Sequence, residues 1–138
     1  QGDPVEAAAR RYLGTFRTEV DGAIRAVLDA TADGAPETVE SLGGGWTAEE
    51  ALAIALYACR CARDFEHGLT IAVTHGGDSD STGAIAGNAL GLILPDQVVS
   101  HRWAREVECR DLIAALSRDL AEAVAGDPAA LCRRYPGA

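Results

Sequence analysis

The densest cluster of oxygen-bearing side chains in the chain lies in residues 76–83, with the sequence GGDSDSTG. Asp78 and Asp80 are separated by one residue and followed by the hydroxyl of Ser81. Two carboxylates and a hydroxyl at this spacing can wrap around an ion such as Mg²⁺ or Ca²⁺, because glycines let the backbone turn tightly and carboxylates supply charge. The spacing therefore indicates a candidate site for a hard cation.

The same loop has a second interpretation, as the cap of the helix that follows it. Asp80 or Ser81 at the N-cap position would accept hydrogen bonds from first-turn amides that otherwise lack partners. The spacing alone leaves both interpretations open. It does exclude an EF-hand, because the twelfth position of the run that starts at Asp78 is Ala89 and not a glutamate, and a Walker-type phosphate loop, because no Gly-Lys-Ser/Thr follows.

The element behind the loop is rich in small residues, with the sequence GAIAGNALGLIL over residues 83–94. Glycines recur there every four positions, so on a helix Gly83, Gly87 and Gly91 share one face. Each glycine inside a helix costs about 1 kcal/mol relative to alanine, so the spacing needs a packing or functional reason. We expect a neighbouring helix to approach this face closely, and Pro95 to end the helix.

Helical signals dominate the rest of the chain, and strand signals are nearly absent. The T-x-x-E run at Thr47 to Glu50 fits a capping box that starts a central helix, and Asp64 is a candidate N-cap for the next one. A loop containing Pro36 and the triple glycine 43–45 precedes the central helix. The predicted fold is all-α, with further helices over about 4–13, 20–28, 48–62, 65–73 and 107–124, and a short last one from Asp127-Pro128.

Composition places the chain among folded globular domains. A length of 138 residues, 48% hydrophobic and 24% charged, suits one domain with a core of its own. A formal net charge of −9, without dense runs of Lys or Arg, argues against nucleic acid as a partner. No apolar run approaches the roughly 20 residues of a membrane helix.

The cysteines and the N-terminus bear on cellular context. The four cysteines form no C-x-x-C pair and have helix-forming neighbours, which predicts reduced thiols in a cytoplasmic protein. The chain starts at Gln1 with neither a Met nor the features of a signal peptide. We therefore expect a piece of a longer chain.

A longer run, residues 75–87 with the sequence HGGDSDSTGAIAG, resembles the signature of the ADP-ribosylglycohydrolase family. The upstream run GWTAEEAL at residues 45–52 also resembles this family. The similarity is strong over roughly Leu42 to Leu94 and weak in the flanking helices. It implies an all-α, multi-helix orthogonal bundle, of which the whole chain, residues 1–138, would be a single domain or the C-terminal portion.

The resemblance also implies a site. It makes Asp78, Asp80 and Ser81 metal ligands in a centre that holds two divalent ions, Mg²⁺ or Mn²⁺, beside the ribose whose glycosidic bond is cleaved. Gly76, Gly77 and Trp46 become candidates for the wall of an ADP-ribose pocket, although Trp46 suits a packing role equally well. His75 is expected to be a hydrogen-bonded loop residue rather than a base, and His67 and His101 receive no role.

The chain departs from the family pattern in one respect. Family members complete the site with a Ser/Thr-Asp-Asp motif and an acidic residue from the N-terminal part of the domain, and this chain has no Asp-Asp pair. We therefore expect an N-terminal half that is absent or lies on a separate chain, and little activity from these 138 residues alone.

Three functional hypotheses follow from the sequence. The first is metal-dependent hydrolysis of the bond between ADP-ribose and a protein side chain, arginine above all, with an ADP-ribosylated protein or ADP-ribose as the partner. The second is a catalytically inactive module that binds ADP-ribose or regulates another protein. The third is a purely structural helical domain in which the acidic loop only caps a helix.

Overall fold

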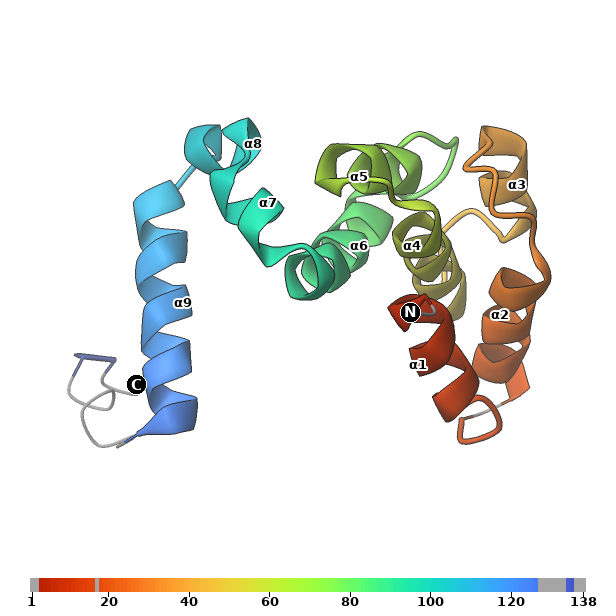
Figure 1. The fold of residues 1–138 in the computed structure, drawn as a ribbon, viewed down its shortest axis with the longest axis horizontal. Coiled ribbons are helices and arrows are strands. Elements are labelled where there is room, and N and C mark those ends of the chain that lie inside the picture. The colour runs from red at the N-terminus through yellow and green to blue at the C-terminus, as the bar shows by residue number, and fades with distance from the viewer. Residues whose placement is uncertain (1–2, 17, 127–133, 136–138) are drawn as a thin grey trace. The chain divides into compact units, whose positions relative to one another are not determined.

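The structure, a computed structural model of the chain, describes residues 3–16, 18–126 and 134–135 (Figure 1). The chain divides into two compact units, residues 1–99 and 100–138. Each unit is described below by itself.

All regular elements of the described residues are α-helices, which confirms the predicted all-α fold. Their bounds are α1 Pro4–Tyr12, α2 Thr18–Asp29, α3 Pro36–Ser41, α4 Ala48–Cys61, α5 Phe65–Val73, α6 Ser79–Ile93, α7 Pro95–Ser100, α8 Arg102–Glu106 and α9 Arg110–Ala125. None of these helices is long and apolar enough to cross a membrane. The expected short helix at Asp127-Pro128 lies outside the described residues.

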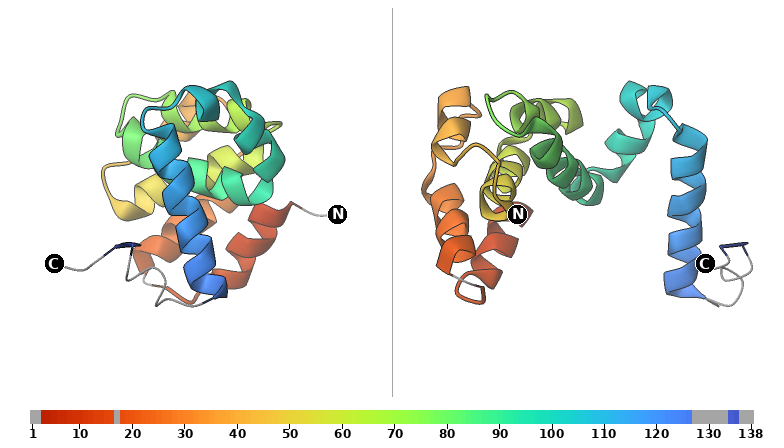
Figure 2. Two further views of the ribbon diagram at one scale, coloured as in Figure 1. Left: turned by 90° about the vertical axis from the view of Figure 1, so that its left-hand side faces the viewer. Right: turned by 180° about the vertical axis from the view of Figure 1, so that it is seen from behind.

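Helix α4 is the centre of the first unit, as its nearly uniform apolar sequence predicts. It packs against α1, α2, α5 and α6, and the view from behind shows it between the α1–α3 side and the α5–α6 side of this unit (Figure 2). Ile54, Tyr57 and Ala58 of α4 are fully buried. They form a core with buried residues of the neighbouring helices, and this core fixes the positions of α4 and α6, which the two loops of the site precede.

Helices α5 and α6 approach each other through glycines on both sides. A Cβ at Gly83 of α6 would lie 2.8 Å from Val73 of α5, and one at Gly68 of α5 would lie 3.0 Å from Leu90 of α6. The expected close approach is therefore correct at Gly83. It is wrong for Gly87 and Gly91, where an added Cβ would meet nothing within 4 Å among the described residues.

Two local predictions before α4 need correction. Residues 36–41, expected in a loop, form helix α3, because Pro36 occupies the first turn, where its missing N–H costs nothing. Thr47 is the N-cap of α4 but makes no side-chain capping bond, and Glu50 instead accepts from the amide of Trp46 at 3.1 Å. The predicted helix start is right, but the carboxylate of Glu50 binds the amide of Trp46 instead of the amide of the N-cap residue, Thr47.

Asp64 caps α5 as predicted, since its carboxylate accepts from the amide of His67 at 2.7 Å. The N-cap of α6 is Asp78, rather than the predicted Asp80 or Ser81, because the helix already begins at Ser79. Pro95 coincides with the end of α6, as expected, and opens α7 in turn.

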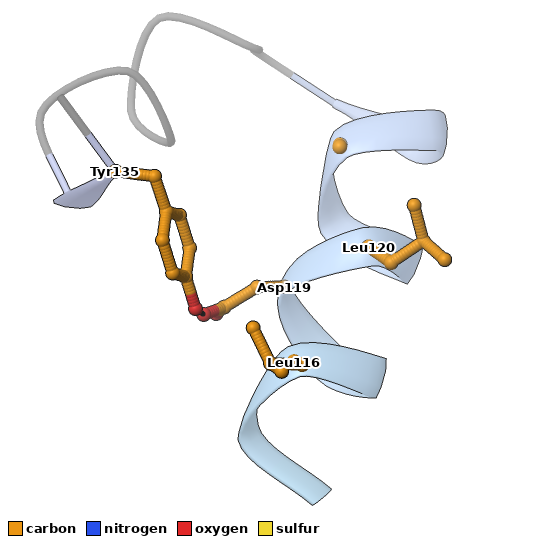
Figure 3. Close-up of a pocket in the computed structure, with 5 residues that line it drawn as sticks. Leu116, Asp119, Leu120 and Tyr135 are labelled. Carbon is orange, nitrogen blue, oxygen red and sulfur yellow. Dashed lines mark hydrogen bonds between the residues drawn. The ribbon is translucent and has the colours of Figure 1, made fainter. Parts of the chain in front are cut away.

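The second unit contains α8 and α9, where one long helix from Val107 was expected. Val107 is the C-cap of α8, and Cys109 adopts a left-handed conformation, with φ of 57°, that separates the two helices. At the far end of α9, Tyr135 donates to the buried carboxylate of Asp119 at 2.5 Å, and Arg134 pairs with the same group (Figure 3). A cavity of about 250 Å³ adjoins this contact, lined by Leu116, Asp119, Leu120, Ala123 and Tyr135.

Candidate metal and ligand site

The acidic loop joins the end of α5 to the start of α6. Asp78 is the N-cap residue of α6 but makes no side-chain capping hydrogen bond. Asp80, in the first turn, accepts a hydrogen bond of 3.1 Å from the amide of its neighbour Ser81. The Ser81 amide still contributes to the lowered pKa of the Asp78 carboxyl, so a weak capping interaction remains beside any role in metal binding.

The side chains of Asp80 and Ser81, two of the three predicted ligands, lie within hydrogen-bonding reach of the third, the Asp78 carboxyl. Hydrogen bonding by the side chain of Asp80, and next by that of Ser81, lowers the pKa of the Asp78 carboxyl. The nearby His75 contributes in the same direction, more weakly. Asp78 is thus ionised at neutral pH, and its charge lies beside a second carboxyl and a hydroxyl.

The donor set consists of hard oxygen atoms alone. Two carboxylates and a hydroxyl are the ligand types that Mg²⁺ and Mn²⁺ prefer, so these residues fit one such ion in part. The described residues bring no group of three or more His, Cys, Asp or Glu side chains into a metal-binding arrangement. Two adjacent divalent ions would need further carboxylates.

A tight backbone contact holds the loop in place. The amide of Asp78 donates to the carbonyl oxygen of Gly44 at 2.8 Å. A Cβ on Gly77 would lie 1.8 Å from that same oxygen, so no residue other than glycine fits there without backbone movement. Gly77 was predicted to let the backbone approach a ligand, and in the structure its close approach is to Gly44.

His75 and Thr82 connect the two ends of the loop. His75 uses one ring nitrogen, Nδ1, to accept from the amide of Gly77 at 3.1 Å, while Nε2 lies 3.1 Å from the hydroxyl of Thr82. Thr82 is fully buried and donates to the carbonyl of Ala72 at 2.7 Å. His75 is therefore a hydrogen-bonded loop residue, as expected from the sequence.

A cavity of about 330 Å³ borders this loop. It brings together the residues predicted for an ADP-ribose pocket, because Trp46, Gly76 and Gly77 all line it. The side chain of Trp46 is 73% exposed, so it stands at the rim of the cavity and outside the core. The remaining lining residues are Glu40, Gly43, Gly44 and His75.

Sequence reasoning missed Glu40 and Thr82. Glu40 belongs to α3, which was expected to be a loop, and no motif marks it. Thr82 had a signal, since it lies four residues after Asp78, on the same side of the predicted helix. The unassigned histidines have local roles: His67 accepts from the amide of Arg63 at 3.4 Å, and His101 caps α8.

Comparison with known protein families covers nearly the whole chain. Residues 1–130 match the family described as ADP-ribosylglycohydrolase. The chain belongs to the ADP-ribosylglycohydrolase family. The match extends beyond the two sequence runs that first indicated it, and it includes α9, so both units carry family sequence.

An archaeal relative of this ADP-ribosylglycohydrolase-family chain was also found. It is an uncharacterized protein of Archaeoglobus fulgidus, 33% identical over 87 residues, which are 61% of this chain and 27% of the relative. The chain thus spans about a quarter of the length of this curated relative. No solved structure matches the chain.

Proposed function

We propose that this chain contributes the acidic metal loop and part of the ligand pocket to an enzyme that hydrolyses the glycosidic bond between ADP-ribose and a protein side chain, with arginine as the preferred side chain. The observation that carries the proposal is that the side chains of Asp80 and Ser81 both lie within hydrogen-bonding reach of the Asp78 carboxyl, in a loop that borders the cavity. Family membership supports the reaction class.

In this proposal Asp78, Asp80 and Ser81 hold Mg²⁺ or Mn²⁺. When bound, such an ion orients ribose hydroxyls and lowers the pKa of bound water. The chain itself supplies negative charge through Asp78, whose carboxyl has a lowered pKa. It also supplies rigidity, because the amide of Asp78 is held by Gly44.

Trp46, Gly76 and Gly77 form the proposed pocket for ADP-ribose. An exposed indole at the rim offers a flat apolar face to a base or a ribose. Gly76 and Gly77 also line the cavity and, lacking side chains, leave backbone atoms accessible to a ligand. Glu40 adds a carboxylate that can accept hydrogen bonds from sugar hydroxyls.

The complete site requires ligands from elsewhere. We place the Ser/Thr-Asp-Asp motif and the further acidic residue that the family resemblance implies on another part of the family domain, in the same polypeptide or in a separate one. Two observations support this: two adjacent divalent ions need more than two carboxylates, and the chain spans about a quarter of its archaeal relative.

A second candidate function is binding of ADP-ribose without catalysis. The observation that favours it is that no third acidic or histidine ligand joins Asp78 and Asp80 among the described residues. A module of this kind would use the Trp46 cavity and bind the nucleotide without needing the ion.

Isothermal titration separates these functions. The hydrolase proposal expects Mn²⁺ to bind the chain, ADP-ribose to bind more tightly when Mn²⁺ is present, and D78N and D80N to abolish the metal effect. Each asparagine keeps the shape of the side chain and removes its charge. Binding of ADP-ribose that ignores both Mn²⁺ and the two substitutions would favour the non-catalytic module.

A further inference from the structure

We propose that His75 is a positioning residue for the metal loop, acting as a neutral clamp between Gly77 and Thr82. The inference rests on the proposed function, since the loop that His75 orders is the one assigned to the metal. It adds a role for a residue that the proposed ligand set does not use.

The hydrogen bonds of His75 determine which ring nitrogen carries the proton. The amide of Gly77 can only donate, so Nδ1, at 3.1 Å, must be unprotonated and act as the acceptor. The proton of the neutral ring is then on Nε2, which donates to the hydroxyl oxygen of Thr82 at 3.1 Å. Both nitrogens are occupied, so the ring is unavailable as a general base while the clamp is closed.

Thr82 gives the clamp its fixed end. Its hydroxyl has one hydrogen, which goes to the carbonyl of Ala72 at 2.7 Å, the shortest of its contacts with acceptors. The oxygen of that hydroxyl remains free to accept from His75. Because Thr82 is fully buried between the end of α5 and the first turn of α6, it cannot move without disturbing the core.

The other end of the clamp is Gly77, the residue that precedes the first proposed ligand. Gly77 precedes Asp78 and packs against the carbonyl of Gly44 so tightly that a Cβ would overlap it. The bond from Gly77 to His75 and the bond from Asp78 to Gly44 restrain two successive amides. The direction in which the Asp78 carboxylate leaves the backbone is set by this pair of restraints.

The test uses substitutions that keep one half of the clamp each. In His75→Asn, the amide oxygen takes the place of Nδ1 and can accept from Gly77. In His75→Gln, the amide nitrogen takes the place of Nε2 and can donate to Thr82, while the acceptor for Gly77 is lost. His75→Ala removes both, and His67→Asn is the matched control on the adjacent helix α5, away from the loop.

Two measurements are made on the full chain: Mn²⁺ affinity from electron paramagnetic resonance, and hydrogen exchange of the Gly77 and Asp78 amides from NMR. We expect H75A and H75Q to weaken Mn²⁺ binding about tenfold, the lower end of the effect of removing groups that support metal ligands from outside, and to speed exchange at Gly77. H75N keeps the acceptor for Gly77 and loses the donor to Thr82, so it should recover part of both properties, and H67N should change neither.

Equal behaviour of H75N and H75Q, or wild-type behaviour of H75A, would overturn the clamp. If H75A does not fold, the comparison of H75N with H75Q still decides. If the wild-type chain itself fails to bind Mn²⁺, the metal assignment of the proposed function is wrong, whereas the exchange rates at Gly77 still decide whether His75 orders the loop.

Discussion

The amide of Asp78 donates a hydrogen bond of 2.8 Å to the carbonyl oxygen of Gly44. This contact joins the loop before α4 to the loop before α6, far apart in the sequence. Gly44 also lines the cavity bordered by Trp46, so this hydrogen bond holds the acidic turn beside that cavity.

The first prediction concerns two glycines with opposite surroundings. Gly77→Ala would place a Cβ 1.8 Å from the carbonyl of Gly44, and we expect it to destabilise the fold by about 1–3 kcal/mol. The added Cβ of Gly87→Ala meets no atom of the described residues within 4 Å, and we expect a gain of about 0.5–1 kcal/mol from better helix propensity. Urea unfolding followed by circular dichroism gives both values. Equal effects of the two substitutions would contradict the described contact.

The second prediction concerns the buried hydroxyl of Tyr57, which anchors the loop between α2 and α3. It accepts from the amide of Gly34 at 3.0 Å and lies 2.9 Å from the carbonyl of Thr31. Tyr57→Phe leaves these groups without their partner and should cost about 1–3 kcal/mol of unfolding free energy. Tyr12→Phe, at a half-exposed ring, is the control and should cost almost nothing. If Tyr57→Phe leaves the free energy of unfolding unchanged, the hydroxyl does not anchor the loop and water satisfies these groups instead.

A third prediction follows from the carboxyl of Asp33 in the same loop. Its pKa is lowered, first by the amide of Ala35 and next by the hydroxyl of Tyr57. A carboxyl whose pKa is depressed in the folded state stabilises the fold above its unfolded pKa of about 3.9, and this contribution is lost as the pH falls through the folded pKa. Melting temperature should therefore fall more steeply with acidification below about pH 4 in the wild type than in Asp33→Asn. Parallel curves would rule out a contribution from Asp33.

The fourth prediction concerns the thiols. Burial raises the pKa of Cys59 to about 11, and its thiol points to the carbonyl of Ala86. Since only the thiolate reacts, iodoacetamide at pH 8 should modify Cys59 roughly a hundredfold more slowly than an ordinary thiol. Exposed Cys109 is the internal comparison, and cleavage after Arg60 separates Cys59 from Cys61 in peptide mapping. The difference should vanish in urea; if it is already absent in the folded chain, Cys59 is not buried as described.

Most helix positions were predictable because their signals are local. The apolar run of α4, the capping carboxylate of Asp64 and the stop at Pro95 act over one or two turns, and the structure confirms all three. The error at α3 has a local cause as well, since Pro36 was taken as a loop residue when it suits the first turn of a helix.

The contacts of the site were not predictable in the same way. The sequence identified Asp78, Asp80 and Ser81 as neighbours along the chain, and whether they bind metal remains a prediction. It did not indicate that Gly77 packs on Gly44, that Glu50 accepts from Trp46, or that Glu40 borders the cavity. Each of these pairs depends on how α3, α4 and α6 meet around the core.

The sequence by itself determined the helical class, most helix ends and the family, because periodicity, caps and motifs are written within short stretches of chain. Only the tertiary structure decided the partners of His75 and which glycines lie in close contacts. The physical reason is the separation along the chain of the residues that interact. A helix is stabilised by bonds four residues apart, whereas the loop is held by atoms that meet only after the helices have packed.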